Sequence, residues 1–237
     1  MFDLLRRLPP VPAVCEVCAR WPSETVCADC RERHGRWLPR CRSCALPLAP
    51  GLDLCSRCTQ SPPGPLRELA ARVDYRHPWV SLVARFKTDP TWAAPMARLI
   101  WQAPEAVRLL DETDCLLPIP LSPAKLAQRG FNQAWELARA LRRLAGKPPA
   151  ASPCLLRRDA AWQDQHRLSR ADRLDNVRGA FSVTGQPHEL EDRRVLLVDD
   201  VATTGATLRA AADVLLQAGA REVSALVFAR TPAPQDS

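Results

Sequence analysis

Short apolar runs alternate with amphipathic segments in the second half of the chain. The apolar runs Cys115–Pro118, Val195–Val198 and Val223–Phe228 have the length and composition of buried strands. An amphipathic segment at about Thr207–Ala218 separates the last two runs and ends at Gly219, a residue typical of helix ends. Strand, helix and strand in succession predict a right-handed crossover, and therefore an α/β fold with a mainly parallel sheet and flanking helices.

The same periodicity predicts further helices and strands. Amphipathic segments at about His77–Lys87 and Thr91–Glu105 are expected to be helices. A long helical segment is expected to start at Ser122-Pro123 and to reach about Leu144, with serine as the N-cap and proline in the first turn. The other expected elements are a strand at Ala70–Tyr75, short strands at Leu155-Leu156 and Ala180–Val183, and a polar, Arg-rich surface loop at Arg157–Arg178.

Eight of the ten cysteines form four CxxC pairs, separated by eight, ten and ten residues. A CxxC turn directs two thiolates at one ion, and two such turns complete the tetrahedral shell that Zn²⁺ prefers. The spacing predicts two structural zinc ions, held by pairs taken in order or by an interleaved cross-brace; disulfides are the less favoured alternative. The predicted ligands are Cys15, Cys18, Cys27, Cys30, Cys41, Cys44, Cys55 and Cys58.

The composition changes at the proline-rich stretch Ser61–Pro65, which is typical of a linker. Two domains are therefore expected, a cysteine-rich double zinc ribbon at 1–62 and an α/β domain at 66–232. No apolar stretch approaches the roughly 18 residues that cross a bilayer. Because Met1–Cys15 also lacks the apolar core of a signal peptide, the sequence predicts a cytoplasmic protein without membrane insertion.

The net charge of +7 comes from thirty arginines and three lysines. A basic balance favours phosphate-bearing partners such as nucleotides or nucleic acid, although arginines on solvated helix faces also account for it. Single-stranded DNA is one candidate partner, because arginines can follow the phosphates while Trp135 or Trp162 stacks on bases.

The most specific chemistry lies in the segment Val195–Leu208, where an apolar run is followed by two acids, a small-residue turn and a helix start. Backbone N–H groups, threonine hydroxyls and a helix N-terminus favour an anion, and Gly205 allows close approach. Paired carboxylates at a strand end can accept hydrogen bonds from two ribose hydroxyls; the alternative is that they only cap the turn. The predicted ribose-binding pair, which would also be the catalytic pair of an enzyme, is Asp199 and Asp200. The predicted phosphate-binding turn consists of Val201, Ala202, Thr203, Thr204, Gly205, Ala206 and Thr207.

This fourteen-residue segment matches the phosphoribosyl-pyrophosphate (PRPP) motif of type I phosphoribosyltransferases. Together with the CxxC array, it makes the chain resemble the ComF family, phosphoribosyltransferase-like proteins with a double zinc ribbon that are associated with natural competence and DNA uptake. The resemblance implies a type I phosphoribosyltransferase fold. Other segments that look like family signatures are Phe86-Lys87, Pro118–Leu121, Arg129–Gln133 and the series Gln165, Leu168, Arg173, Asn176 and Ala180-Phe181.

The type I resemblance also implies roles for residues outside the motif. The turn after Pro118–Leu121 would approach the pyrophosphate, with Lys125 and Arg129 as cationic partners; a solvated helix position is the alternative for Arg129. The segment Arg157–Arg178 would close over the site, and a plain solvated loop is its alternative. Trp162 stands where family members often carry threonine, which could alter closure or provide stacking on a base.

Two functions are compatible with the resemblance. One is a PRPP-binding protein of DNA uptake and processing, with competence-machinery proteins as partners. The other is a phosphoribosyltransferase of nucleotide salvage, which uses Mg²⁺ and PRPP to transfer a phosphoribosyl group to a nitrogen nucleophile. A base pocket needs convergent polar groups against apolar walls, and residues 75–105 show no such pattern. The sequence therefore predicts that PRPP binding is easier to demonstrate than turnover.

Overall fold

The computed structural model describes residues 13–61, 64–146, 149–158 and 180–233. The chain divides into two compact units, Met1–Arg36 and Trp37–Ser237. The division falls between Cys30 and Cys41, inside the cysteine-rich segment. The second half of that segment therefore belongs to the same compact unit as the sheet.

The described part of the first unit is a cysteine-rich turn followed by helix α1 (Ala28–His34). A single bridge pairs Ala13 with Ser23. Cys27 is the N-cap of α1, and its Sγ accepts a hydrogen bond from the backbone N–H of Cys30 at 3.4 Å. A thiol therefore occupies the position that serine or aspartate usually takes at a helix start.

The second unit is built on a five-stranded sheet in which every neighbouring pair is parallel, in the order β1-β7-β6-β2-β3. A separate antiparallel pair consists of β4 and β5. The expected mainly parallel sheet is confirmed. The strands are β1 (Glu68–Asp74), β2 (Cys115–Pro118), β3 (Ala150–Ala151), β4 (Leu156–Arg158), β5 (Phe181–Val183), β6 (Arg194–Ala202) and β7 (Glu222–Arg230).

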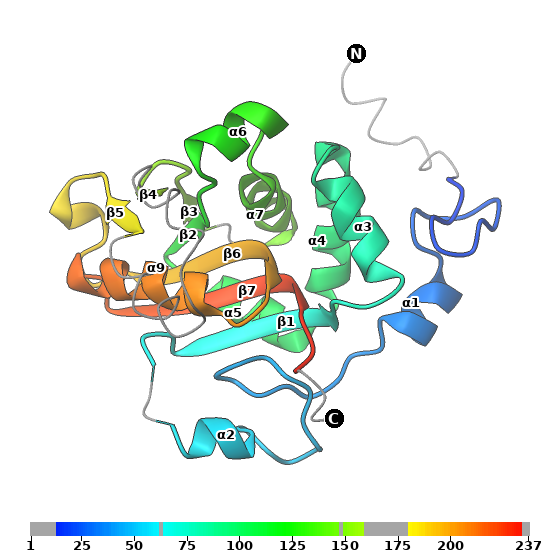
Figure 1. The fold of residues 1–237 in the computed structure, drawn as a ribbon, viewed down its shortest axis with the longest axis horizontal. Coiled ribbons are helices and arrows are strands. Elements are labelled where there is room, and N and C mark those ends of the chain that lie inside the picture. Colours follow the sequence, from blue (N-terminus) through cyan, green and yellow to red (C-terminus); the bar gives the residue numbers. More distant parts are fainter. Residues whose placement is uncertain (1–12, 62–63, 147–148, 159–179, 234–237) are drawn as a thin grey trace, which may run out of the picture. The chain divides into compact units, whose positions relative to one another are not determined.

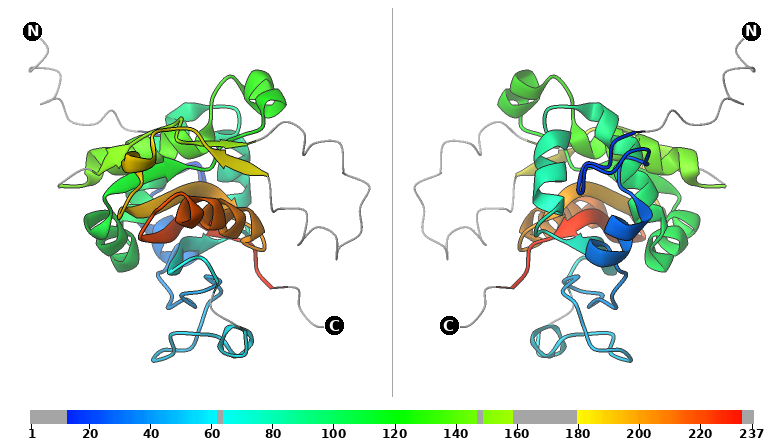
Figure 2. Two further views of the ribbon diagram at one scale, coloured as in Figure 1. Left: turned by 90° about the vertical axis from the view of Figure 1, so that its left-hand side faces the viewer. Right: turned by 90° about the vertical axis from the view of Figure 1, so that its right-hand side faces the viewer.

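Helices cover both faces of this sheet (Figures 1 and 2). In β6, Val195 and Leu197 pack in one core cluster with Leu208 of helix α9, whereas the equally buried Leu196 points to the opposite face, because strand side chains alternate. In Figure 1, α9 lies in front of the sheet and α5 behind it. The helices are α2 (Ser56–Thr59), α3 (Trp79–Phe86), η2 (Pro90–Trp92), α4 (Ala93–Trp101), α5 (Pro104–Glu112), α6 (Pro123–Arg129), α7 (Gln133–Leu144), η4 (Pro187–Glu189) and α9 (Ala206–Gln217).

Two of the expected helices are divided in the structure. The expected helix at Thr91–Glu105 ends at Trp101, and a further helix starts at Pro104, because proline cannot donate the N–H bond that would continue α4. The expected helix from Ser122 to Leu144 breaks at Gly130, whose φ of 78° is left-handed. Asn132 then caps α7 through its side chain. Helical periodicity alone was wrong at both breaks.

Strand β6 extends to Ala202, beyond the expected end at Val198. Asp199 pairs in register with Val227, so the two acids lie inside the paired strand. The apolar run ends at Val198, but the backbone of β6 stays paired with β7 as far as Ala202. The side chains of this last part lie at the edge of the sheet and need not be apolar. Of the expected loop Arg157–Arg178, residues 159–178, including Trp162, lie outside the described residues. Within the described ranges, no helix combines the length and apolar character that a bilayer span requires.

Candidate functional site

The two acids lie at the carboxyl edge of the sheet, next to the end of β2. The N–H of Ile119 donates to the carbonyl of Val198 at 2.9 Å, so the turn that follows β2 starts beside Asp199. The carboxyl ends of adjacent parallel strands are where α/β sheets bind ligands. The structure therefore brings the Pro118–Leu121 turn and the segment after β6 to one edge.

Asp199 and Asp200 each accept a hydrogen bond from the following backbone N–H. The N–H of Asp200 donates to Oδ1 of Asp199, and the N–H of Val201 to Oδ1 of Asp200, both at 2.8 Å. Burial, and then the Asp200 carboxylate, raise the pKa of Asp199 well above its usual range, while the Arg158 guanidinium lowers it. A carboxyl pair in this state favours ligands that donate hydrogen bonds or carry positive charge.

The turn after β6 ends in helix α9. Gly205 precedes α9 with a left-handed φ of 76°, a conformation that glycine adopts without strain. Oγ1 of Thr204 accepts a hydrogen bond from the N–H of Ala206 at 3.2 Å, whereas the N-cap residue Gly205 has no side chain to offer. The side chains of Thr203 and Thr204 are exposed. The first N–H groups of a helix lack intrahelical partners, and an anion can bind there.

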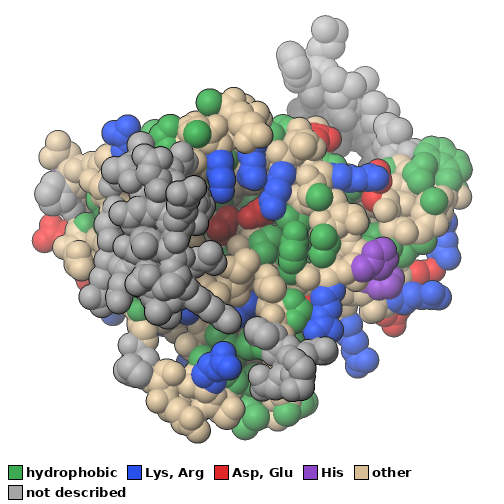
Figure 3. Space-filling view, viewed as in Figure 1, with side chains coloured by type: hydrophobic (Ala, Val, Ile, Leu, Met, Phe, Trp, Pro, Cys, Tyr) green, Lys and Arg blue, Asp and Glu red, His purple; other side chains and the backbone are tan. Residues whose placement is uncertain are grey.

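Lys125 and Arg129 lie on α6, which follows the β2 turn. Nη1 of Arg129 donates to Oε1 of Gln133 at 2.9 Å, and Nδ2 of Asn132 donates to the carbonyl of Ile119 at 3.1 Å. The Arg129–Gln133 segment therefore fixes α6 to the turn beside Asp199. Among the described residues, neither cation forms an ion pair with the two acids. Figure 3 shows Lys and Arg side chains above acidic side chains in the middle of this face.

The eight CxxC cysteines form two groups of four, and within each group all sulfur atoms lie within 4.8 Å of one another. Sγ of Cys18 lies 3.7 Å from that of Cys27, and Sγ of Cys44 lies 3.8 Å from that of Cys55. A tetrahedron with metal–sulfur bonds of about 2.3 Å has edges of about 3.8 Å, whereas a disulfide measures about 2.05 Å. The donors fit one ion in each group. The pairs combine in order: Cys15, Cys18, Cys27 and Cys30, then Cys41, Cys44, Cys55 and Cys58.

Each group contains one thiol that ionises readily. Burial raises the pKa of Cys15, but hydrogen bonds from backbone N–H groups, that of Cys27 first, outweigh it and lower the pKa to about 6. The Cys41 thiol is lowered to a pKa of about 7 in the same way, with the N–H of Cys55 as the leading donor. Thiolates are the form that binds metal, so backbone N–H groups favour that form at one cysteine of each group, while burial raises the pKa of Cys30 and Cys44.

Comparison with known proteins agrees with this geometry. Residues 163–236, which include the turn after β6, match the phosphoribosyl transferase domain family. The chain is 32% identical over 230 residues to DNA utilization protein YhgH of Salmonella typhimurium, covering 93% of this chain and 98% of that protein. It is 30% identical over 210 residues to competence protein F of Haemophilus influenzae, covering 86% and 90%.

The chain belongs to the ComF family. Competence protein ComFC of Bacillus subtilis is 27% identical over 220 residues, which cover 92% of this chain and 78% of that protein. The fold of this ComF-family chain is the type I phosphoribosyltransferase fold, preceded by paired cysteine clusters of the zinc-ribbon kind.

Three arginines of this ComF-family chain lie near the site and were not predicted from the sequence. Arg158, on β4, acts on the pKa of Asp199. Arg209 donates from Nη2 to the carbonyl of Thr204 at 2.5 Å. Arg230, the last residue of β7, donates from Nη1 to the carbonyl of Thr203. All three come from elements other than the motif strand. Only the position of Arg209, one helical turn after Gly205, could have suggested its role.

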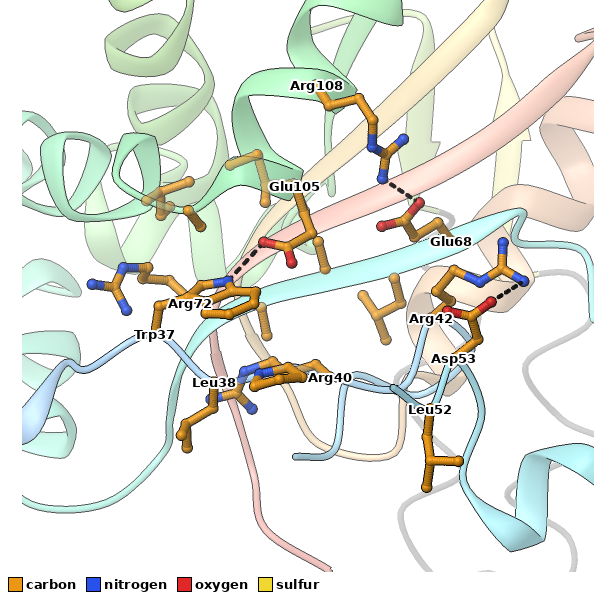
Figure 4. Close-up of a pocket in the computed structure, with 18 residues that line it drawn as sticks. Trp37, Leu38, Arg40, Arg42, Leu52, Asp53, Glu68, Arg72, Glu105 and Arg108 are labelled. Atoms are coloured by element: carbon orange, nitrogen blue, oxygen red, sulfur yellow. Dashed lines mark hydrogen bonds and ion pairs between the residues drawn. The ribbon is translucent and has the colours of Figure 1, made fainter. Parts of the chain in front are cut away.

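A cavity of about 230 Å³ lies elsewhere in the same unit, between residues 37–53, strand β1 and helix α5 (Figure 4). Its wall includes Trp37, whose Nε1 donates to Oε2 of Glu105 at 2.9 Å. Its other lining residues include Arg40 and Arg72, each held by a hydrogen bond within the unit. None of the residues 199–207 lines this cavity. It is therefore separate from the carboxylate pair.

Proposed function

We propose that this ComF-family chain binds PRPP with Mg²⁺ at the turn after β6 and serves in DNA uptake and processing. One observation carries the proposal: the carboxylates of Asp199 and Asp200, the turn Thr203–Gly205 and the start of α9 lie in continuous succession at the carboxyl edge of the sheet. Carboxylates that can accept hydrogen bonds from hydroxyls therefore lie beside a helix start that can bind an anion. PRPP offers both partners, because its ribose carries a vicinal diol and a 5′-phosphate.

Each part of the edge has a chemical task in this proposal. The carboxylate oxygens of Asp199 and Asp200 accept hydrogen bonds from the ribose hydroxyls. The turn and the N-terminus of α9 hold the 5′-phosphate. Lys125 and Arg129 on α6 attract the pyrophosphate, and bound Mg²⁺ would neutralise part of its charge. The residues that hold the two ends of the ligand thus come from two neighbouring strand ends.

The cellular role rests on relatives that are named for DNA utilization and competence. Competence-machinery proteins and single-stranded DNA are the partners that this role implies. Zinc is the ion proposed for the two cysteine clusters, because four thiolates suit it and leave no open position for catalysis. A cytoplasmic location, where thiols stay reduced, suits eight cysteine ligands.

Calorimetric titration of the zinc-loaded chain with PRPP and Mg²⁺ tests the binding site. We expect binding in the wild type and strong loss in the double variant Asp199→Asn/Asp200→Asn. In both asparagines Oδ1 can keep accepting the backbone N–H bond seen at 2.8 Å, so the fold should persist. The amide nitrogen then replaces the carboxylate oxygen that a ribose hydroxyl needs.

Each lost charge-assisted hydrogen bond is expected to weaken binding by about 1.5–3 kcal/mol. Two such bonds correspond to a loss of roughly 10²–10⁴-fold in affinity. Asp111→Asn, an exposed acid on α5, is the matched control and should bind like the wild type. Unchanged affinity in the double variant would remove the carboxylate pair from the site.

A second candidate function is phosphoribosyl transfer. The observation that favours it is the desolvated carboxyl of Asp199 beside Asp200, since negative charge there can stabilise positive charge that develops at the anomeric carbon. Against rapid transfer, the large side chains of Trp79, Met96 and Ile100 in helices α3 and α4 are apolar and buried, so they offer no polar group to a base. We therefore expect PRPP binding with slow or no pyrophosphate release. Rapid release with an ordinary purine or pyrimidine, abolished in the double variant, would establish the enzyme instead.

A further inference from the structure

One buried side chain joins the second cysteine cluster to the phosphate turn. Arg230 is only 7% exposed. Its Nε donates to the carbonyl of Cys44 at 2.7 Å, and its Nη1 donates to the carbonyls of Thr203 and Thr231. A single rigid guanidinium therefore contacts both the backbone of a metal-ligand residue and the backbone of the turn that precedes α9.

The second cluster is built into the edge of the sheet. The N–H of Leu69 in β1 donates to the carbonyl of Arg42, inside the Cys41–Cys44 turn, at 2.7 Å. Nη1 of Arg40 donates both to the carbonyl of Ala45 at 3.0 Å and to Oδ1 of Asp74 at 2.8 Å. Ala45 itself is fully buried in the core cluster. The first cluster, by contrast, lies in the other compact unit.

The position of the Cys44 carbonyl depends on the ion that the cluster holds. Four thiolates from residues 41–58 converge on one point. Of this segment only Ala45 belongs to the core cluster, so the segment lacks a core large enough to order itself. In such segments metal binding supplies the free energy of folding. Loss of the ion would release the Cys44 carbonyl and leave Nε of a buried guanidinium without its acceptor. Arg230 would then shift, and the Thr203 carbonyl with it.

The orientation of Thr203 matters for the ligand. A peptide unit whose carbonyl is held by Arg230 directs its N–H, which belongs to the following residue Thr204, the opposite way. Fixing one carbonyl therefore fixes one N–H donor of the anion-binding turn. Arg209 acts on the next peptide in the same manner, through the carbonyl of Thr204. Arg209 lies on α9 and, among the described residues, forms no hydrogen bond to the cysteine module, whereas Arg230 bonds to both the turn and the metal site.

We propose that the ion of the second cluster raises the affinity of the phosphate turn for PRPP, with Arg230 as the positioning residue that transmits the effect, and that the ion of the first cluster does not. The inference rests on the proposed PRPP site. Coupling between two binding sites is reciprocal. PRPP must therefore raise the affinity of the second cluster for zinc by the same factor by which zinc raises the affinity for PRPP.

The test is a zinc-transfer titration of the full chain with a coloured chelator, with and without PRPP and Mg²⁺. In the wild type we expect one of the two zinc ions to become at least fivefold harder to remove when PRPP is present, and the other to be unaffected. The Cys18→Ser variant, which alters the first cluster, should keep the protected ion. The Cys58→Ser variant should lose it and bind PRPP at least fivefold more weakly.

Arg230→Lys separates positioning from charge. Lysine keeps the positive charge but has one nitrogen, which cannot reproduce the two ends of the guanidinium fork. We expect this variant to bind two zinc ions and to bind PRPP more weakly, with equal zinc affinity in the presence and absence of PRPP. The wild-type titration does not depend on how well any variant folds.

The outcomes distinguish the two claims. If calorimetry shows PRPP binding but zinc transfer is the same with and without PRPP, the coupling is refuted while the PRPP site stands. If PRPP made both zinc ions equally harder to remove, the coupling would also be refuted, because PRPP would then act on the metal by a route that does not pass through Arg230. Absence of PRPP binding to the zinc-loaded wild type overturns both claims.

Discussion

Asp199 should destabilise the ligand-free protein at neutral pH, so Asp199→Asn should raise the free energy of unfolding. Burial and the adjacent Asp200 raise the pKa of Asp199 well above its usual range. In the unfolded chain the same group has a pKa of about 3.9. The folded state therefore binds the proton more tightly. As pH rises above about 4, ionisation costs more in the folded state, and the free energy of unfolding falls until the pH passes the folded pKa.

The magnitude follows from one titrating group and its contacts. A single group changes the slope of unfolding free energy against pH by at most about 1.4 kcal/mol per pH unit. Asparagine at position 199 can keep the hydrogen bond from the N–H of Asp200, whose nitrogen lies 2.8 Å from Oδ1 of Asp199. What the substitution removes is the attraction between the Asp199 carboxylate and the Arg158 guanidinium. We expect a gain of about 1–2 kcal/mol at pH 7–8, which is within the usual range for a single stabilising substitution. This corresponds to a rise in Tm of roughly 2–8 °C for a chain of this length.

Asp114→Asn is the matched control, because the sign of its effect is opposite. Hydrogen bonds from the Arg194 side chain lower the pKa of Asp114 to about 2. Its stabilisation is therefore present above about pH 4 and is lost as pH falls towards 2. The Arg194 and Asp114 side chains are 40% and 30% exposed, so solvent screening limits the loss to about 1 kcal/mol at neutral pH.

Denaturant unfolding of the ligand-free wild type and both variants, followed by circular dichroism from pH 4 to pH 8, provides the measurement. The difference between Asp199→Asn and the wild type should grow with pH over this range. A variant that is less stable than the wild type, or a difference that stays constant with pH, would refute the burial of a charged carboxyl beside Asp200.

Three further outcomes are expected. Gly205→Ala should lower the free energy of unfolding by about 1–2 kcal/mol, because a φ of 76° strains any side chain. Calorimetric melting measures the effect, with Gly146→Ala as the control because an added Cβ there meets nothing within 4 Å. Equal Tm values for the two variants would contradict the left-handed turn. Elemental analysis of reduced, chelator-washed protein should find about two zinc ions per chain, since each closed site uses four thiolates. A protein that contains no zinc would refute this prediction. Cys58→Ser should lower the Tm of the sheet-containing unit more than Cys15→Ser does, because Cys58 belongs to that unit and Cys15 does not; equal effects on its melting would argue against an integrated second cluster.

Local pattern in the sequence determined most of the strands, the clustered cysteines and the turn after β6. Strand β2 begins and ends where its apolar run does, at Cys115 and Pro118. The CxxC spacing identified eight cysteines that the structure gathers into two groups. These features depend on neighbours within a few positions along the chain. Backbone geometry over so short a range is set by the residues themselves.

The tertiary structure alone decided which distant residues meet at the site. The cysteine pairs combine in order, a choice that the spacing left open. The Arg230 side chain contacts Thr203, which is 27 positions away in the sequence, and Cys44, which is 186 positions away. The charge of Arg158, on the separate β4–β5 pair, acts on the pKa of Asp199. Such contacts follow from the order of strands in the sheet. That order is set by burial of both sheet faces at once, and no local run of residues encodes it.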